Sequence, residues 1–527
     1  MSASIALANL SWSTPEGRPL LSNVDLSFTT ERTGLVGRNG VGKTTVLKLM
    51  AGDLAPQAGR VTVNGTLGVL RQTVQVGADE TVADLFDVRH AVAILDRAEA
   101  GQANADELAG ADWTLEARLA EALARLGLDA TAATRLSTLS GGQRTRAGLA
   151  ALVFAEPDFI LLDEPTNNLD REGRRMVIDL LADWTGGAIV VSHDRELLDT
   201  MDAIVELTTL GATRYGGNWS HYRERKAVEL ASARRELADA ERRVDEIARR
   251  SQETTERKAR RDRGGERTRS RGDIPRIQLN AMKNRAENTS GANARTAERL
   301  RTQALDDAAS ARRKVEVLQP LTMALPSTGL PAGRIVLKVD AVSVGYEHRP
   351  VLHELSFDIA GPERVAVTGP NGSGKTTLLA LITGQLQPAS GSVQVMTRFA
   401  LLDQQVSLLD PALSIRDNFR RINRQVDENA CRAALARFMF RADAALQITA
   451  TLSGGQMLRA GLACVLTGDP PPLLILDEPT NHLDIESIEA VEAGLQAYDG
   501  ALLVVSHDET FLEAVGVTRR LELQPAR

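Results

Sequence analysis

Residues 369–376 read Gly-Pro-Asn-Gly-Ser-Gly-Lys-Thr, and residues 37–44 read Gly-Arg-Asn-Gly-Val-Gly-Lys-Thr. Glycines at this spacing let backbone amides curl around phosphate groups at a helix N-terminus, where the helix dipole favours anions. A glycine-rich turn that merely precedes a helix is the structural alternative, and the motifs that follow each loop disfavour it. The two stretches, called the phosphate loops below, predict two nucleotide-binding domains.

Three further motifs follow each phosphate loop in the same order. Leu-Ser-Gly-Gly-Gln stands at 139–143 and 452–456, and these stretches are called the signatures below. Asp-Glu-Pro-Thr stands at 163–166 and 477–480, and Ser-His-Asp at 192–194 and 506–508. Eight motifs in two ordered copies indicate an internal duplication. We therefore predict a first repeat at 1–220, a linker at 221–326 and a second repeat at 327–527.

The phosphate loops supply most of the residues predicted to bind ATP. Those residues are Gly37, Arg38, Asn39, Gly40, Val41, Gly42, Lys43, Thr44 and Thr45 in the first repeat, and Gly369, Pro370, Asn371, Gly372, Ser373, Gly374, Lys375, Thr376 and Thr377 in the second. The two lysines are expected to reach the β- and γ-phosphates, and the hydroxyls of Thr44 and Thr376 to ligand Mg²⁺.

Acidic pairs end an apolar strand in each repeat. Asp163 and Asp477 are predicted to hold Mg²⁺ through water. Glu164 and Glu478 follow them, and each is expected to orient or deprotonate the attacking water. Adjacent acids at a strand end can also be solvated caps, but a phosphate loop upstream favours the catalytic interpretation.

Glutamine and histidine follow other strand-like segments. Gln72 and Gln404 are predicted to sense Mg²⁺ and the attacking water, although an isolated Gln is often a surface residue. His193 and His507 follow apolar strands and suit a contact to the γ-phosphate that stabilises transition-state charge. The alternative for each histidine is a buried side chain with its hydrogen bonds satisfied.

Strand patterns alternate with helical patterns in both repeats. Residues 5–12 and 24–28 alternate as short strands, and the pattern returns at 335–344. This alternation predicts an α/β fold with a mainly parallel sheet. A helix-rich insertion, including 113–128 and 427–440, separates each phosphate loop from its signature. The insertion is longer in the first repeat, since 68 positions separate Gln72 from Ser140 and 49 separate Gln404 from Ser453. We therefore expect a larger helical subdomain there, with a short arm.

The linker has a different pattern from the repeats. Apolar residues at alternating spacings of three and four predict two coiled-coil helices of an antiparallel hairpin. They are Leu230, Ala233, Leu237, Ala240, Val244 and Ile247, then Leu300, Ala304, Ala308, Ala311, Val315 and Leu318. Gly272-Asp273-Ile274-Pro275 and Ser290-Gly291 interrupt helix. The candidate tip is the region around Arg276, Leu279, Met282 and Arg285.

The linker is basic in an acidic chain. The whole chain has a net charge of −7, but residues 221–320 hold 26 Lys/Arg against 17 Asp/Glu. Residues 257–271 contain eight Lys/Arg. This asymmetry predicts a polyanionic partner, with a solvated helix face as the alternative. No aromatic residue follows Tyr222 in the hairpin, so recognition of RNA shape and backbone is favoured over base stacking.

Composition bears on where the protein works. Cys431 and Cys464 are too few for a disulfide framework and suit a reducing cytosol. No apolar run approaches the roughly 20 residues of a membrane helix, and the N-terminus lacks a signal-peptide pattern. A cytoplasmic protein that is not inserted in a membrane is expected.

Over nearly its whole length the chain resembles the ATP-binding cassette superfamily and, within it, the ABC-F subfamily. The resemblance rests on the paired motifs, on Glu-Pro-Thr-Asn-His-Leu-Asp at 478–484 and on Tyr-Gly-Gly-Asn-Trp-Ser at 215–220. It implies that the repeats close head to tail on two ATP molecules within a monomer. Lys43 and Glu164 would then face Ser453, Gly454, Gly455 and Gln456, while Lys375 and Glu478 would face Ser140, Gly141, Gly142 and Gln143.

The resemblance also implies an aromatic residue that stacks on adenine. Tyr346 fits this role in the second repeat, whereas Thr14 occupies the nearest position in the first, where Trp12 is a substitute. Asn168 also stands where the second repeat has His482. These differences put equal affinity of the two sites in question.

The family implies a ribosome partner, contacted through rRNA and tRNA by the linker. Translation factor and antibiotic-resistance factor are nearly equal expectations. One alternative is the ATPase subunit of a membrane transporter, which has no need of a basic hairpin. The other is a DNA-binding repair ATPase, because charge alone does not distinguish RNA from DNA phosphates.

Overall fold

The computed structural model describes residues 3–70, 77, 79–209, 211–269, 298–299, 301–312, 325–346, 349–481 and 483–524. The chain divides into two compact units. The first comprises Met1–Ser220 and Leu321–Arg527, and so contains both repeats; the second is His221–Pro320.

The first repeat is built on two sheets. Its central sheet has six strands in the order β5 (Leu67–Leu70), β6 (Phe159–Asp163), β7 (Gly187–Val191), β3 (Arg32–Val36), β8 (Ala203–Thr208) and β9 (Gly211–Gly216). All neighbours are parallel except β8 and β9. A smaller antiparallel sheet has the order β2 (Pro19–Phe28), β1 (Ser4–Ser13) and β4 (Ala58–Asn64). Helix α1 (Lys43–Ala51) shares one apolar core with both sheets.

The second repeat has the same two-sheet plan. Its central sheet is parallel, in the order β14 (Phe399–Leu402), β15 (Leu473–Asp477), β16 (Ala501–Val505), β12 (Arg364–Thr368) and β17 (Arg519–Glu522). The antiparallel sheet has the order β11 (Arg349–Ala360), β10 (Ile335–Tyr346) and β13 (Ser390–Val395). Helix α11 (Lys375–Ile382) packs between them. The predicted α/β fold with mainly parallel central sheets is confirmed, and it brings the polar motifs to the carboxyl edge of each sheet.

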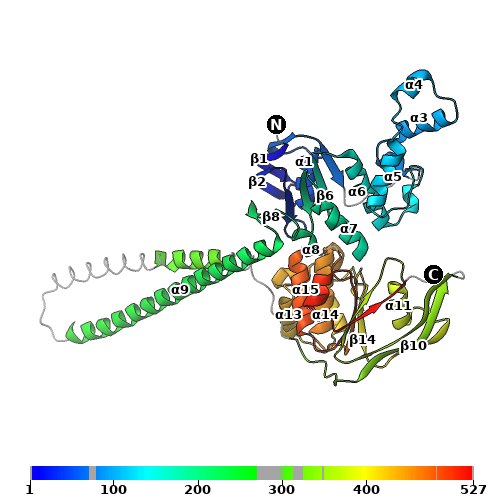
Figure 1. The fold of residues 1–527 in the computed structure, drawn as a ribbon. Coiled ribbons are helices and arrows are strands. Elements are labelled where there is room, and N and C mark those ends of the chain that lie inside the picture. Colours follow the sequence, from blue (N-terminus) through cyan, green and yellow to red (C-terminus); the bar gives the residue numbers. More distant parts are fainter. Residues whose placement is uncertain are drawn as a thin grey trace. The chain divides into compact units, whose positions relative to one another are not determined.

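Each repeat also has a helical subdomain, which stands between its phosphate loop and its acidic pair in the sequence and includes its signature helix. In the first repeat it contains α2 (Val82–Leu85), α3 (Arg89–Glu99), α4 (Ala105–Gly110), α5 (Leu115–Arg125) and the signature helix α6 (Gly141–Ala155). In the second it contains α12 (Ile415–Ile422), α13 (Glu428–Arg437) and the signature helix α14 (Gly454–Leu466). Helices α3 and α4 account for the longer first insertion and project beyond α5 (Figure 1).

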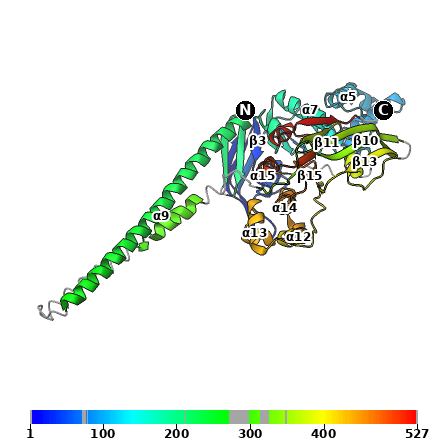
Figure 2. The same cartoon turned by 90° about the horizontal axis from the view of Figure 1, so that it is seen from below.

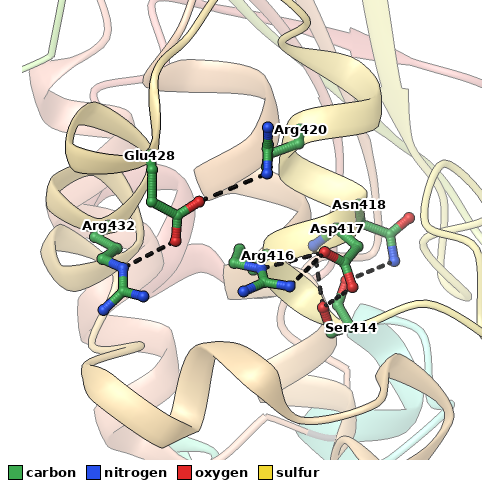
Figure 3. Close-up of polar contacts among 7 residues, drawn as sticks. All are labelled: Ser414, Arg416, Asp417, Asn418, Arg420, Glu428 and Arg432. Carbon is green, nitrogen blue, oxygen red and sulfur yellow. Dashed lines mark hydrogen bonds and ion pairs between the residues drawn. The ribbon is translucent and has the colours of Figure 1, made fainter.

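Polar contacts fix the helical subdomain of the second repeat (Figure 3). Ser414 caps α12 by accepting a hydrogen bond from the backbone N–H of Asp417. Glu428, at the start of α13, accepts a hydrogen bond from Arg432 at 2.9 Å and lies 3.7 Å from Arg420 on α12. The Arg420–Glu428 ion pair thus joins the two helices, while Phe419 and Leu435 lie in the core.

Four helices follow the acidic and histidine motifs. Helix α7 (Arg171–Ala182) follows the acidic pair of the first repeat, and α15 (Ile485–Ala497) follows that of the second. Helices α8 (Arg195–Leu198) and α16 (Glu509–Ala514) follow the Ser-His-Asp turns. Each of the four has an aspartate as its N-cap, which is a favourable residue there.

The described part of the second unit is helical. Helix α9 (Trp219–Arg269) has 51 residues, which corresponds to roughly 75 Å. Residues 301–312 form a helical stretch that runs back alongside it (Figures 1 and 2). Arg312 and Glu241 join the two helices at 2.6 Å, and Ala240 and Ala311 are buried there. The predicted seam residues on α9, from Leu230 to Ile247, are less exposed than the residues between them. That the two helices form a regular coiled coil remains a prediction.

Several predicted features lie outside the described residues. These are the helix interruptions at 272–275 and 290–291, the candidate tip, Gln72, His482 and the predicted seam residues Leu300, Val315 and Leu318. The basic side chains predicted at 257–271 also lie outside the description, although the backbone is helical to Arg269. Among the described helices, none is both long enough and apolar enough to cross a membrane.

Candidate active sites

Each phosphate loop is organised around its own lysine. Lys43 Nζ donates hydrogen bonds to the carbonyl oxygens of Gly37 at 2.6 Å and Arg38 at 3.2 Å. Lys375 Nζ repeats this pattern with Gly369 at 2.8 Å and Pro370 at 3.0 Å. Burial lowers the pKa of both lysines. Each loop therefore surrounds a buried ammonium group that would gain from an anionic ligand.

The first glycine of each loop has no room for a side chain. Gly37 and Gly369 have positive φ values of 151° and 142°. A Cβ atom at either position would lie 2.3 Å from a backbone carbonyl oxygen, of Leu207 or Leu523 respectively. Close packing against the backbone at Leu207 or Leu523 thus requires glycine at both positions.

The acidic pairs occupy the carboxyl ends of β6 and β15. Asp163 and Asp477 are the last residues of these strands. Glu164 and Glu478 follow with left-handed backbones, at φ values of 52° and 47°. Such a conformation is costly for a residue with a side chain and clusters at functional sites. In both repeats this left-handed backbone ends the strand and changes the direction of the chain at the glutamate.

Each glutamate lies beside the histidine of its own repeat. His193 Nε2 is 3.0 Å from Glu164 Oε1, and His507 Nε2 is 3.3 Å from Glu478 Oε1. Burial raises the pKa of Glu164 to about 8 and that of Glu478 to about 7. Burial, with the nearby lysine second, lowers the pKa of His193 to about 3 and that of His507 to about 4. The imidazoles are therefore neutral at physiological pH, and the carboxylates are poised for proton exchange.

A cavity of about 330 Å³ gathers the motifs of the first repeat with one residue of the second. It is lined by Leu20, Asn39, Gly40, Gly42, Lys43, Thr44, Thr45, Asp163, Glu164, Asn167, Val191, His193 and Ser453. Ser453 belongs to the second signature. This cavity is called the first site below.

A cavity of about 410 Å³ gathers the corresponding motifs of the second repeat and is called the second site. It is lined by Asn168, Leu169, Val351, Asn371, Gly372, Gly374, Lys375, Thr376, Thr377, Gln404, Asp477, Glu478, Asn481, Val505 and His507. Asn168 and Leu169 come from the first repeat. Ser140 does not line this cavity, but a Cβ on Gly142 would lie 3.9 Å from Asn371 Nδ2.

The model of the family described as ABC transporter matches residues 21–167 and 352–481, one match in each repeat. The chain belongs to the ATP-binding cassette family. It is 32% identical to the energy-dependent translational throttle protein EttA of Mycobacterium tuberculosis, over 94% of this chain and 87% of that protein. It is 34% identical to the tylosin resistance ATP-binding protein TlrC of Streptomyces fradiae, over 94% and 92% respectively. These relatives place the chain in the ABC-F subfamily, and it is an ATPase.

The fold is also similar to that in a solved structure of the RNase-L inhibitor. The TM-score is 0.60, with 19% identity over 96% of this chain and 88% of the other. At this identity the similarity concerns the fold alone.

The signature serines of this ABC-F chain cap the helices that begin there. Ser140 Oγ accepts a hydrogen bond from the backbone N–H of Gln143, and Gln143 Oε1 accepts one from Ser140 N. Ser453 and Gln456 form the same capping box at the start of α14. Each serine thus presents a hydroxyl and a positive helix end together, a combination suited to an anion.

The contacts between the two ABC-F repeats include residues that the sequence analysis did not assign to the sites. Asp484, the N-cap of α15, accepts a hydrogen bond at 2.7 Å from the backbone N–H of Asn39. Asp170, the N-cap of α7, accepts one at 3.3 Å from Asn371. The sequence could have indicated these two aspartates, because Leu-Asp follows the Asp-Glu-Pro-Thr motif in both repeats, at 169–170 and 483–484.

The residues predicted to hold Mg²⁺ fit a divalent cation at each ABC-F site. Asp163 is buried and hydrogen-bonds to Thr44, and burial raises its pKa. Thr376, Gln404 and Asp477 line the second site together. A small number of protein ligands alongside substrate phosphates is the usual arrangement for Mg²⁺.

The adenine contacts are less defined. The side chain of Tyr346 lies outside the described part of the chain. Trp12 is partly buried and packs against the core of the first repeat, and Leu20 lines the first site. Stacking by Tyr346 and Trp12 remains a prediction.

Proposed function

We propose that the two sites bind ATP with Mg²⁺ and hydrolyse it, and that closure of the repeats engages the ribosome through the linker. The observation that carries the proposal is the composition of each cavity. Ser453 completes a site built mainly by the first repeat, and Asn168 with Leu169 complete the site of the second. A ligand in either cavity contacts both repeats and so stabilises their association.

The residues divide the chemistry at the first site. Lys43 and the amides of its loop bind phosphates, and Ser453 with the start of α14 contacts the γ-phosphate from the other repeat. Glu164 orients the attacking water and accepts its proton, while neutral His193 donates a hydrogen bond to developing charge. When bound, Mg²⁺ would neutralise charge on the transferred phosphoryl group, held by Thr44 and Asp163. The corresponding roles at the second site belong to Lys375, Thr376, Asp477, Glu478 and His507.

The linker is the part proposed to contact RNA. Its excess of basic residues supports binding to a phosphate backbone. The 51 residues of α9 make the linker long enough to follow an extended RNA surface.

ATP hydrolysis controls how long the repeats stay closed. Intact ATP contacts both repeats at each site and stabilises the closed state, and its cleavage removes that stabilisation so that the protein is released from its partner. We place the working protein in the cytoplasm, as a monomer.

The relatives support two versions of the ribosomal role. EttA is named as a translational throttle and TlrC as a tylosin resistance protein, and the chain is similar to both at 32% and 34% identity. A translation factor and a factor that protects ribosomes from an antibiotic therefore remain equal candidates. A transporter ATPase would leave the basic hairpin without a purpose, and a DNA-repair ATPase is the other outcome of the test.

Sucrose-gradient sedimentation with purified ribosomes tests the proposal. The Glu164→Gln/Glu478→Gln double variant keeps ATP bound because both catalytic carboxylates are gone. It should migrate with the ribosome peak in ATP and stay at the top of the gradient without nucleotide. Absence from the ribosome peak in ATP, at moderate salt, would contradict the ribosomal role and leave DNA or a membrane complex as the partner.

A further inference from the structure

A buried ion pair crosses between the repeats beside the first site. Arg195 stands two residues after His193, at the start of α8. Its Nη1 donates to Glu492 Oε1 at 2.8 Å and its Nη2 to Glu492 Oε2 at 3.3 Å. The two side chains are 7% and 10% exposed. The pair is therefore a two-pronged contact that is almost excluded from water.

The turn that carries His193 continues directly into α8, the helix that begins with Arg195. Asp194 caps α8 by accepting hydrogen bonds from the backbone N–H groups of Glu196 at 3.1 Å and Leu197 at 3.2 Å. Leu197 and Leu198 belong to this single turn of helix and are fully buried. Displacement of the Arg195 side chain would therefore act on a short capped segment that begins directly after the histidine.

The partner helix α15 also contacts the phosphate loop of the first repeat. Asp484 accepts the Asn39 hydrogen bond, and Glu486 Oε2 lies 2.6 Å from Arg38 Nε. Glu492 follows Asp484 by eight positions, which is about 12 Å along the helix. Helix α15 of the second repeat thus contacts both the phosphate loop of the first site and α8, which follows the histidine turn.

The second site has no corresponding pair among the described residues. Glu509 occupies the position of Arg195, and Ile178 on α7 occupies the position of Glu492. Glu509 forms an ion pair at 2.6 Å with Arg520 of its own repeat, and lies 3.4 Å from Arg171, whose side chain is 73% exposed. Pro370 replaces Arg38 and cannot form an ion pair. The duplication preserved the reacting residues but not these contacts.

We propose that Arg195 and Glu492 are positioning residues for the first site, and that they make it the site that opens last. This inference rests on the proposed function of the first site in ATP binding. Opening there requires separation of a buried two-pronged ion pair together with the Arg38–Glu486 contact. The second site opens without breaking an equivalent buried pair, so it exchanges nucleotide first.

The release of ATP from the Glu164→Gln/Glu478→Gln variant tests this inference. Radiolabelled ATP is bound with Mg²⁺, excess unlabelled ATP is added, and retained label is followed by rapid filtration. Two phases of equal amplitude are expected, and Lys43→Ala should abolish the slow one. Arg195→Ala should accelerate the slow phase by about tenfold or more, because Glu492 then loses its buried partner. The fast phase should change by less than about twofold.

Two further variants separate positioning from general damage. The exchange Arg195→Glu/Glu492→Arg should restore most of the slow phase, since the pair re-forms with reversed polarity. Glu509→Ala, at the matched position of the second repeat, should leave both phases unchanged. A single release phase, or equal acceleration of both phases by Arg195→Ala, would overturn the inference.

The outcome is independent of ribosome binding. Biphasic release from a protein that ignores ribosomes would support the inference while the ribosomal role fails. Failure of the unmodified chain to bind ATP at all would overturn both.

Discussion

Asn418 Nδ2 donates a hydrogen bond to Thr449 Oγ1 at 3.0 Å, and both residues are almost completely buried. The same amide group donates to the carbonyl oxygen of Asp410 at 2.9 Å and accepts from the backbone N–H of Asp410 at 2.8 Å. Thr449 in turn donates to the carbonyl oxygen of Leu413 at 2.8 Å. One side chain on α12 (Figure 3) therefore ties together two loops that flank the helix.

Asn418→Ala should destabilise this subdomain by roughly 3 kcal/mol, because several buried polar groups lose their partner at once. The chain divides into two compact units, so hydrogen exchange measured on peptides from α12 and α13 is a better readout than one unfolding transition. Exchange there should become faster, with little change in the central sheets. Asn429→Ala, an exposed asparagine on α13, is the matched control. Unchanged protection of α12 in Asn418→Ala would show that the network contributes nothing.

Removal of one catalytic carboxylate should separate the two sites. Glu164→Gln or Glu478→Gln alone should lower single-turnover hydrolysis at its own site by about 10²-fold or more, because a general base is lost. ATP binding should persist in both, since the loops and lysines are intact. Glu116→Gln, at an exposed position on α5, should have no effect. If phosphate release from both sites survives the double replacement, these glutamates are not the bases.

The cysteines should be inert in the folded protein. Burial raises the pKa of Cys464 to about 12, and burial raises that of Cys431 as well. Because a raised pKa disfavours the thiolate, only about one Cys464 in ten thousand is ionised at pH 8. A chromogenic disulfide reagent at that pH should detect no thiol before denaturation and two afterwards. Ala433→Cys, on the exposed side of α13, should react at once. Rapid native labelling of Cys464 would mean that the core around α14 opens readily.

Much of the fold was predictable because the motifs are local. Local sequence alone specifies the turn at 37–44 and the strand end at 159–164. Each motif also occurs twice, which strengthens its assignment. The helix predicted at 427–440 contains α13, and the strand predicted at 335–344 lies within β10. The boundaries moved by a few residues, since helix ends depend on packing and capping as well as pattern.

The contacts across the repeats were not predictable from pattern alone. Arg195 and Glu492 are separated by 297 positions, and each resembles an ordinary surface charge in its own helix. Their contact across the repeats leaves the two side chains only 7% and 10% exposed. The same holds for Glu486, whose partner Arg38 was predicted solely as a nucleotide contact. Long-range ion pairs of this kind require the tertiary structure, because sequence spacing contains no information about them.

The basic linker segment should determine ribosome affinity without influencing the ATP sites. Replacing Arg260, Arg261 and Arg263 with Glu should abolish ATP-dependent sedimentation with ribosomes, because attraction to RNA phosphates becomes repulsion. Less drastic Ala replacements should lower the slope of log affinity against log salt by about one for each phosphate group that an arginine no longer neutralises. ATP binding and basal hydrolysis should remain, since the altered residues lie in the second unit and the sites in the first.

A matched control changes the same charge elsewhere. Arg60, Arg125 and Arg424 are exposed in the ATPase unit, and their replacement with Glu alters net charge equally. If this control weakens ribosome binding as much as the linker variant, non-specific charge rather than the hairpin accounts for affinity. If the linker variant loses ATP binding as well, the division of labour between the two units is wrong. Retained ATP binding with selective loss of ribosome binding would assign RNA recognition to the hairpin.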